Sequence, residues 1–479
     1  MEANLETSVT NGGGRRDRLA MATAAATDDG LVLDLWSRDL ARDHGFEPLR
    51  VEGTLPAGLR GTLYRNGPGQ FGQFGRRYRH PFEGDGAVTA VRIADGRAAG
   101  ASHITPTAGL VAERSAEKML YGLSVPWPRR IANLVRGQTK NTANTSVAMW
   151  QGRLFALMEG GLPTELDPAT LAMVGESDLG GVVRGMFSAH PHRVDSRATL
   201  YNFGIEYGRH TTLHCYALPD AGPARHLAAI PLAGPPMLHD FIATDTHLVF
   251  FVSPVRLSVP RMLLGAGSFE QMFQWRPEHG VDVICVPIDR PDEVVRFTTD
   301  AFFQWHFANA YTRSATTLVV DYVRYPNHDT FHAIGDYSRG VSGNALAGGR
   351  YHRATIDLAA KTLRSRELSE LACEFPTVGP GVRGAEHARA YAVFGDLDTI
   401  GAIETIGPAT GRVTAHTLAS GERASEPLHV DGHLLSLCHA KDAAYVAVYD
   451  ATRIPDGPVA KIWIDHHVPI TFHGVFAPA

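Results

Sequence analysis

The chain has 479 residues, of which 44% are hydrophobic and 20% charged, and its formal net charge is -5. This charge excludes nucleic acid as the main partner, because the chain lacks the basic excess that neutralises phosphates. The length fits two or three ordinary domains, or one large barrel or propeller. The four cysteines lie far apart without a CxxC pair, so we interpret them as small core residues in a reducing cytoplasm.

The first thirty residues are rich in Gly, Ala and Thr, and they lack the continuous apolar core of a secretory signal. We therefore predict a disordered tail over residues 1–30 and a single domain over residues 31–479. The sequence has no uninterrupted apolar run of about 18 residues, which predicts that no helix spans a membrane. The expected location is the cytoplasm, with peripheral contact to the inner face of the membrane.

Strand and turn signals dominate the rest of the chain. Residues 46–68 predict a strand-turn-strand unit punctuated by Gly and Pro, and residues 88–93 alternate as a strand. From residue 147 onward one hairpin theme recurs, at residues 161–175, 353–367 and 402–416. Further strand candidates are residues 199–205, 247–252, 281–286, 317–322 and 445–449.

Such repeated strand-turn-strand units, with almost no helical periodicity, predict an all-β fold of the propeller type. Seven blades would average about 65 residues each. A propeller has a central axis on which segments that are far apart in the sequence can converge.

Two apolar segments interrupt the strand pattern. Residues 118–137 combine Leu, Trp and Ile with three arginines, a composition that suits an amphipathic segment at a membrane surface or a helix capping a β core. Residues 253–280 form a long connection rich in Leu, Met, Phe and Trp, which is typical of lids and tunnel walls. We predict that both belong to an apolar loop and helix cap over the top face of the propeller, through which peripheral membrane contact would occur.

Histidine is the chain's most informative residue type. With 23 histidines against four cysteines, a bound metal would be held by imidazole rather than thiolate. Four histidines stand in apolar, turn-bounded segments: His190, His239, His306 and His473. Their spacing excludes a zinc finger or a helix-borne HExxH site, so a shared metal requires a fold that brings four distant segments together.

A single histidine near an apolar run is more often a hydrogen-bonded core or surface residue. We apply that interpretation to five others: His192, His433, His439, His466 and His467. The C-terminus itself is apolar and opens with a proline, so we expect it to be buried rather than frayed, with His473 directed inward.

Four neutral imidazoles suit iron, copper, nickel or zinc. A zinc ion with four histidines would be closed, whereas a six-coordinate iron would keep positions for oxygen and water. Glu159 and Glu374 lie in apolar, strand-like segments where an unpaired carboxylate would be costly to bury, so they are candidates to hold the second nitrogen of ligand histidines. The chain has no GxSxG elbow, dinucleotide fingerprint or local cysteine-nucleophile signature.

Several motifs follow one another along the chain in an order that chance explains poorly. They are VEGTLP and LRGTLYRNGP within residues 51–68, HPFEGDG at 80–86, KNTANTS at 140–146, ALMEGGLPTELDPATL at 156–171, SAHPH at 188–192, HDF at 239–241, HFANAY at 306–311, EFP at 374–376, SEP at 425–427 and PITFHG at 469–474. With these motifs the chain resembles the carotenoid cleavage oxygenase family, and within it the bacterial apocarotenoid oxygenases, from about Leu33 onward.

The resemblance implies a seven-bladed β-propeller with Fe(II) on its axis and O2 as co-substrate. The iron would be held by the four histidines singled out above: His190, His239, His306 and His473. Glu159 and Glu374 match the family's carboxylates that orient ligand histidines. No catalytic or cofactor-binding residue beyond this metal site is implied.

The family normally has a third such carboxylate, in an acidic E-D-D-G stretch shortly after the SEP motif. The corresponding residues 425–450 contain no such stretch. We therefore expect the third carboxylate to be missing, with Asp431 or a backbone carbonyl beside His473 instead. Loss of a partner of this kind lowers metal affinity by about tenfold to a hundredfold.

The implied activity is oxidative cleavage of a C=C bond of an apocarotenoid, an apolar carotenoid-derived polyene, to two carbonyl products, one of them a retinal-like aldehyde. A stilbene-cleaving dioxygenase is an alternative, because such relatives hold a phenol with a Tyr and a Lys, a role that sequence does not assign to Lys140. Two further alternatives are an isomerase with the same iron and fold, and a metal-impaired propeller that binds an apolar ligand without turnover.

Overall fold

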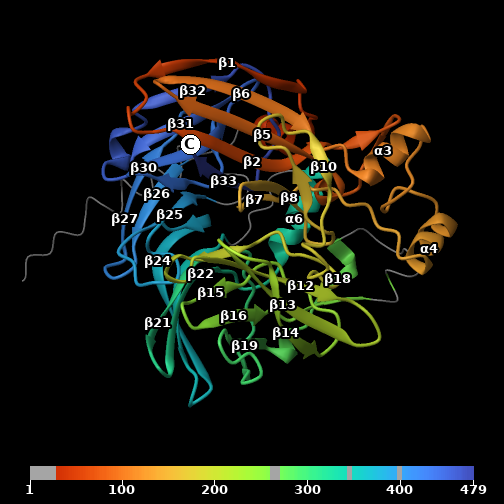
Figure 1. Ribbon diagram of the computed structural model, residues 1–479, viewed down its shortest axis with the longest axis vertical. Helices are drawn as coiled ribbons and strands as arrows, with labels where there is room; N and C mark the ends of the chain where they lie inside the picture. Colours follow the sequence, from red (N-terminus) through yellow and green to blue (C-terminus); the bar gives the residue numbers. More distant parts are fainter. Residues whose placement is uncertain (1–28, 259–260, 262–269, 342–347, 396–401) are drawn as a thin grey trace, which may run out of the picture.

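The computed structural model describes residues 29–258, 261, 270–341, 348–395 and 402–479. The described chain is built mainly of antiparallel β-sheets with a few short helices, of which α3 (Ala108–Ser115) and α4 (Trp127–Val135) project at the right of Figure 1. Most of the predicted N-terminal tail lies outside the described residues.

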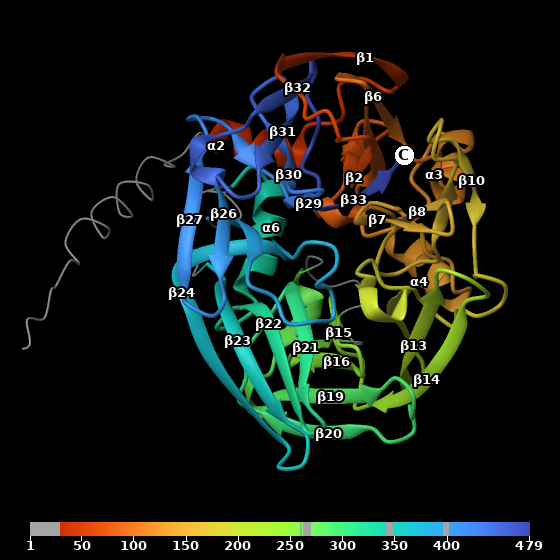
Figure 2. The same ribbon diagram turned by 60° about the vertical axis from the view of Figure 1, so that its left-hand side comes forward.

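Seven antiparallel blades, counted within the described residues, follow one another round a ring in chain order (Figure 2). The first blade consists of β33 (His473–Pro478), β2 (Gly61–Gln70), β5 (Asp85–Ala94) and β6 (Arg97–Ile104), and the second of β7 (Ser146–Trp150), β8 (Arg153–Leu157), β9 (Thr164–Leu166) and β10 (Met173–Glu176). The third blade consists of β11 (His192–Val194), β12 (Thr199–Glu206), β13 (Thr211–Pro219) and β14 (Arg225–Leu232), and the fourth of β15 (Ile242–Ala243), β16 (His247–Val252), β19 (Val281–Pro287) and β20 (Val295–Thr299).

The remaining three blades complete the ring. The fifth blade consists of β21 (Phe307–Ser314), β22 (Thr317–Arg324), β23 (Arg350–Asp357) and the first part of β24 (Thr362–Thr377). The sixth consists of the rest of β24 with β25 (Ala390–Phe394), β26 (Ala402–Gly407) and β27 (Arg412–Thr417). The seventh consists of β28 (Arg423–Ala424), β29 (Leu428–Val430), β30 (His433–His439), β31 (Ala444–Asp450) and β32 (Ala460–Ile464). Strand β1 (His44–Gly53) pairs with both β32 and β6, and so joins the last blade to the first.

Strand β16 shows why the blades stack. Because side chains alternate along a strand, Leu248 and Phe250 face the blade of β12, whereas Val249 and Phe251 face the blade of β22. All four side chains are buried. A strand that is apolar on both faces fits only between two neighbouring sheets, so the continuous apolar run at residues 247–252 specifies an interior blade.

The two ends of the chain close the ring. The last strand, β33, pairs antiparallel with β2, with Asn66 opposite His473 and Gly61 opposite Pro478. The expectation that the C-terminal segment is buried is confirmed for residues 468–472, which are buried ahead of the half-buried strand. His473 therefore sits on the innermost strand of the first blade.

Several helices and short hairpins lie outside the blades. They are α2 (Asp29–Ser37), α3 (Ala108–Ser115), α4 (Trp127–Val135), α6 (Asp329–Ser338), the hairpin of β17 (Val255–Leu257) and β18 (Phe273–Trp275), and the short pair β3 (Gly72–Gln73) and β4 (Arg76–Arg77). Helix α4 fulfils the prediction of a helix within residues 118–137. Helices α2 and α6 were not predicted, because each is short and owes its stability to mutual packing, such as the stacked rings of Trp36 and Tyr337.

One buried carboxylate in this fold, that of Glu404, has no hydrogen-bond partner among the described residues. Glu404 of β26 is opposite Ala392 of β25 and Ala415 of β27, and its side chain is fully buried. Burial raises the pKa of Glu404 to about 8.

This environment predicts a pH-dependent stability. Between about pH 4.5 and pH 8 the unfolded chain has lost the proton that folded Glu404 keeps, so the free energy of unfolding falls by up to about 1.4 kcal/mol per pH unit as pH rises. Glu404→Gln should flatten this dependence and raise the melting temperature at pH 8, as measured by thermal denaturation across pH. The control Glu370→Gln, at an exposed position of β24, should leave the pH dependence of the melting temperature unchanged. Equal pH dependence in the two variants would show that Glu404 is not its source.

Candidate metal centre

Four histidines stand where the innermost strands of four blades begin. His190 lies just before β11, His239 just before β15 and His306 immediately before β21, and His473 is the first residue of β33. Innermost strands lie nearest the axis of a propeller, so residues at the same end of each approach one another. The structure thus brings together all four histidines that the sequence singled out.

The imidazole nitrogens converge on one point. His306 Nε2 lies 3.2 Å from His239 Nε2 and 3.1 Å from His473 Nε2. The ring centroid of His190 lies 4.2 Å from that of His239 and 4.7 Å from that of His473. Two nitrogens about 2.1 Å from one ion and at right angles to each other would be about 3 Å apart, so these separations fit a shared divalent metal.

His190 supplies an independent test of that fit. Its Nε2 is buried and has no hydrogen-bond partner among the described residues; a carboxylate oxygen of Glu159 lies 3.7 Å away. Burial, followed by the neighbouring His239, lowers the pKa of His190 to about 4, so the imidazole is neutral at pH 7. A neutral nitrogen left unpaired in a buried site is costly unless an electrophile such as a metal ion occupies its lone pair.

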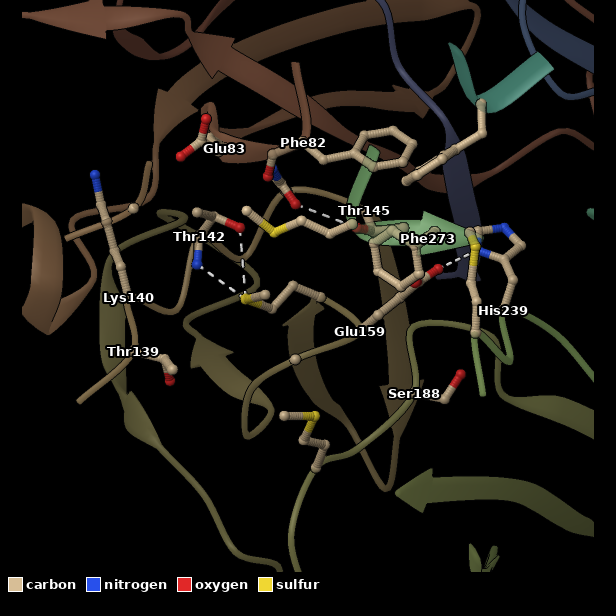
Figure 3. Close-up of a pocket in the computed structure, with 18 of the residues that line it drawn as sticks. Phe82, Glu83, Thr139, Lys140, Thr142, Thr145, Glu159, Ser188, His239 and Phe273 are labelled. Carbon is tan, nitrogen blue, oxygen red and sulfur yellow. Dashed lines mark hydrogen bonds and ion pairs between the residues drawn. The ribbon is translucent and has the colours of Figure 1, made fainter. Parts of the chain in front are cut away.

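Carboxylates hold the opposite nitrogen of two of these rings. Glu159, in the bend after β8, is paired with His239 Nδ1 (Figure 3). Glu374 of β24 has Oε2 2.5 Å from His306 Nδ1, and it also accepts hydrogen bonds from the Phe375 N–H and the Tyr325 hydroxyl. A carboxylate on Nδ1 fixes the tautomer and turns Nε2 toward the axis.

The charge state of Glu159 follows from two opposing effects. Burial alone raises the pKa of this carboxyl, but the contacts with His239 and His190 outweigh burial and lower the pKa to about 2. Glu159 is therefore ionised at neutral pH, as a carboxylate that accepts an imidazole N–H must be.

A third carboxylate is present, and the expectation that it is missing was wrong. Glu426 Oε1 lies 2.8 Å from His473 Nδ1. Glu426 is the acidic residue of the SEP motif itself, in the bend between β28 and β29, which turns its side chain toward the axis. Asp431 is exposed in the turn between β29 and β30 and does not contact His473. The argument that selected Glu159 and Glu374, an acidic residue in a buried segment, would have found Glu426 as well.

A second residue that sequence reasoning missed is Asp240. One of its oxygens lies 2.7 Å from His192 Nε2, and its carboxylate also accepts the backbone N–H groups of Phe241 and Phe307. It thereby ties the segment that carries His239 to the start of β21. His192 is not part of the histidine cluster, as expected, but its contact with Asp240 places it in the layer that supports the cluster.

A cavity of about 530 Å³ lies beside the cluster, and His239, His306 and His473 form part of its wall. Most of the rest is apolar, and Figure 3 shows Phe82 and Phe273 in this wall. Phe331 and the four methionines Met158, Met186, Met237 and Met272 also line the cavity. Tyr121 and Ile131 from the segment around α4, and Leu257 from the connection that follows β16, also line it. Within the described residues no second group of three or more potential ligands has metal-site geometry.

The position of Glu426 predicts which substitution weakens metal binding. Glu426→Ala frees the His473 ring to turn, so the dissociation constant for Co2+ should rise by about tenfold to a hundredfold. The matched control Asp431→Ala removes an exposed carboxylate and should leave the constant unchanged. Absorption titration of the metal-free protein measures both, and equal weakening by the two substitutions would show that Glu426 does not hold the site.

Known proteins share this fold and much of this sequence. The family model RPE65, described as retinal pigment epithelial membrane protein, matches residues 39–478. The apocarotenoid-15,15'-oxygenase of Synechocystis sp. is 33% identical over 458 residues, 89% of this chain and 92% of that protein. Resveratrol cleavage oxygenase 1 of Chaetomium globosum is 32% identical over 57% of this chain and 47% of its own.

A solved structure of a Synechocystis ACO mutant superposes with a TM-score of 0.86 at 30% identity, covering 95% of this chain and 100% of that one. The match confirms the predicted seven-bladed β-propeller. With its family match spanning most of the sequence, the chain belongs to the RPE65 or carotenoid oxygenase family.

Proposed function

We propose that the chain is a non-haem Fe(II) dioxygenase that cleaves a C=C bond of an apocarotenoid to two carbonyl products. The observation that carries the proposal is the convergence of four imidazoles at the wall of a large apolar cavity. It is supported by a relative over most of the chain that is named as an apocarotenoid oxygenase.

The proposed iron ligands are the Nε2 atoms of the four histidines, namely His190, His239, His306 and His473. When bound, Fe(II) supplies the electrons that activate O2, the co-substrate, for reaction with an alkene. Glu159, Glu374 and Glu426 hold three of the rings in the orientation that such an ion requires.

The cavity residues select and orient the substrate. The rings of Phe273 and Phe331 pack edge to face with their centroids 5.2 Å apart, and the centroids of Phe82 and Phe331 are 6.2 Å apart. This part of the wall is therefore made of aromatic rings in mutual contact. Such walls exclude water and hold a flat polyene so that one double bond lies beside the histidines. The two cavity carboxylates away from the cluster are engaged: Glu83 accepts the Leu123 N–H, and Glu113 pairs with Lys140.

Lys140 bears on the choice between a polyene and a stilbene. Its Nζ lies 2.5 Å from Asp85 Oδ1, 2.8 Å from Glu113 Oε2 and 3.0 Å from the Tyr78 hydroxyl. The ammonium group donates hydrogen bonds to Tyr78 and Glu113 and forms an ion pair with Asp85, so it is already engaged by protein partners rather than by a phenol in the cavity. This arrangement supports an apolar polyene as substrate over resveratrol or another phenolic stilbene.

We also propose that the region around α4 contacts a membrane from which the substrate is taken up. Trp127 and Val135 of α4 have 54% and 80% of their surface exposed, and Arg129 and Arg136 beside them are exposed as well. An apolar face flanked by arginines suits the membrane interface. None of the helices among the described residues is long and apolar enough to cross a bilayer. In the second predicted contact segment, residues 253–280, positions 259–260 and 262–269 lie outside the described residues.

The dioxygenase assignment predicts the behaviour of protein purified without oxygen. It should contain about one iron per chain, as four imidazoles bind one ion, and should convert a β-apocarotenal and O2 to two aldehydes while leaving resveratrol intact. His306→Ala should lose both iron and activity, whereas His279→Ala, at an exposed histidine, should keep both. Folded protein that binds the apocarotenal but takes up no iron would refute the proposal in favour of a binding protein, and preferred cleavage of resveratrol would correct its substrate.

Membrane contact makes a separate prediction. Trp127→Ser and Val135→Ser together should reduce cosedimentation with phospholipid vesicles, because they remove the apolar side chains that would enter the interface. Val174→Ser is the matched control, since Val174 is a valine of β10, outside α4, with 66% of its surface exposed. Equal vesicle binding by the double variant and the unsubstituted protein would argue against this surface.

A further inference from the structure

Arg65 of β2 is a buried cation directly behind the histidine cluster. Only 1% of its surface is exposed. Its Nη1 lies 2.8 Å from Glu426 Oε2 and 3.2 Å from the Glu426 carbonyl, and its Nη2 lies 2.8 Å from the Phe472 carbonyl. A buried guanidinium is costly unless it is fully paired, so this set of acceptors is a built site rather than an accidental contact.

The backbone leaves a path for the Arg65 side chain. Arg65 is opposite Gly474 in the pairing of β2 with β33. A Cβ at position 474 would lie 2.6 Å from Arg65 Cδ and 2.5 Å from the Tyr64 carbonyl oxygen. Glycine at this position therefore lets the guanidinium run across β33 to Glu426, and the Gly474 N–H also donates to Glu426 Oε2 at 2.9 Å.

The contacts of Glu426 fix its charge. Its two oxygens face the His473 ring N–H, the Arg65 guanidinium and the Gly474 N–H, and all of these are donors. No acceptor is present to receive a proton from the carboxyl, so the geometry is that of an ionised carboxylate.

Arg65 distinguishes Glu426 from the other two carboxylates that hold ligand histidines. Glu374 is hydrogen-bonded by neutral donors besides His306, and the contacts of Glu159 are with histidine rings. Within the described part of the chain, Arg65 is thus the one arginine or lysine paired with any of the three. Asp240, the other buried carboxylate nearby, is paired with His192 and hydrogen-bonds to none of the four histidines.

These contacts set the charge of the centre. Glu159, Glu374 and Glu426 carry three negative charges, a divalent ion carries two positive charges and Arg65 carries one, so the charges of these five groups sum to zero. Oxidation of the ion to the trivalent state leaves one uncompensated positive charge in a buried site, where charge is poorly screened.

We propose that Arg65 is a positioning and charge-balancing residue that orients Glu426, and through it His473, and keeps the buried centre neutral with a divalent ion. This inference rests on the proposed iron centre. Its consequence is a preference for Fe(II) over Fe(III), because a fixed positive charge disfavours loss of an electron from the ion.

Three variants test the charge balance. Arg65→Met makes the Fe(II) centre negative and should lower the Fe(III)/Fe(II) reduction potential, whereas Glu426→Gln makes it positive and should raise the potential. The double variant Arg65→Met/Glu426→Gln restores neutrality and should return close to the unsubstituted value. Spectroelectrochemical titration of the iron-loaded protein without substrate measures all four proteins.

Arg65→Lys separates charge from position. Lysine keeps the positive charge but lacks the planar fork that reaches both Glu426 and the Phe472 carbonyl. Its reduction potential should stay near that of the unsubstituted protein, while its dissociation constant for Co2+ should rise by about tenfold, as for other residues that support metal ligands. A merely structural arginine would not produce this split between the two measurements.

If Arg65→Met alone fails to fold, the reduction potentials of Glu426→Gln and of the double variant still test the charge balance, because the double variant buries no unpaired charge. Adding Arg65→Met to Glu426→Gln should then lower the potential. An unchanged potential in iron-loaded, substrate-cleaving protein would overturn the charge-balancing role while leaving the proposed function intact. Protein that takes up no iron would overturn both.

Discussion

The antiparallel pairing of β33 with β2 is the constraint on which the rest of the structure depends. It closes the ring by joining the two ends of the chain, and it sets His473 opposite Asn66. The Asn66 side chain in turn donates to the carbonyls of Ala143 and Ser146, which ties the closing strands to the next blade. One ladder of backbone hydrogen bonds thereby attaches the closing strand to the first blade and places the last histidine of the cluster.

The site is divided between two kinds of structure. The histidines stand at the beginnings of rigid inner strands, whereas Glu159 and Glu426 come from bends between strands. Strands define positions well, and bends can direct a carboxylate toward a ring nitrogen that a strand alone would not reach. Rigid strands thus supply the convergence of the nitrogens, and the supporting carboxylates supply their orientation.

Local sequence carried much of this information. The run at residues 247–252 matches β16 residue for residue because it is apolar on both faces, and the hairpin predicted at residues 402–416 is β26 and β27. Glu426 lies in the SEP motif itself, whereas the expectation placed the third carboxylate in an acidic stretch after that motif, so a signal that was present was not used. The Asp240 contact with His192 is different, since only the ring arrangement brings the two blades together. Residues whose partners are remote leave no local periodicity to detect.

The place of the closing strand has a consequence for local opening of the fold. His473 is the first residue of β33, and β33 is held in its blade by pairing with β2. If β33 separates from β2, the first blade loses its innermost strand and His473 leaves the other three histidines in the same event. Fraying of one edge and dispersal of the cluster are therefore a single transition, and amide hydrogen exchange along β33 would report on both.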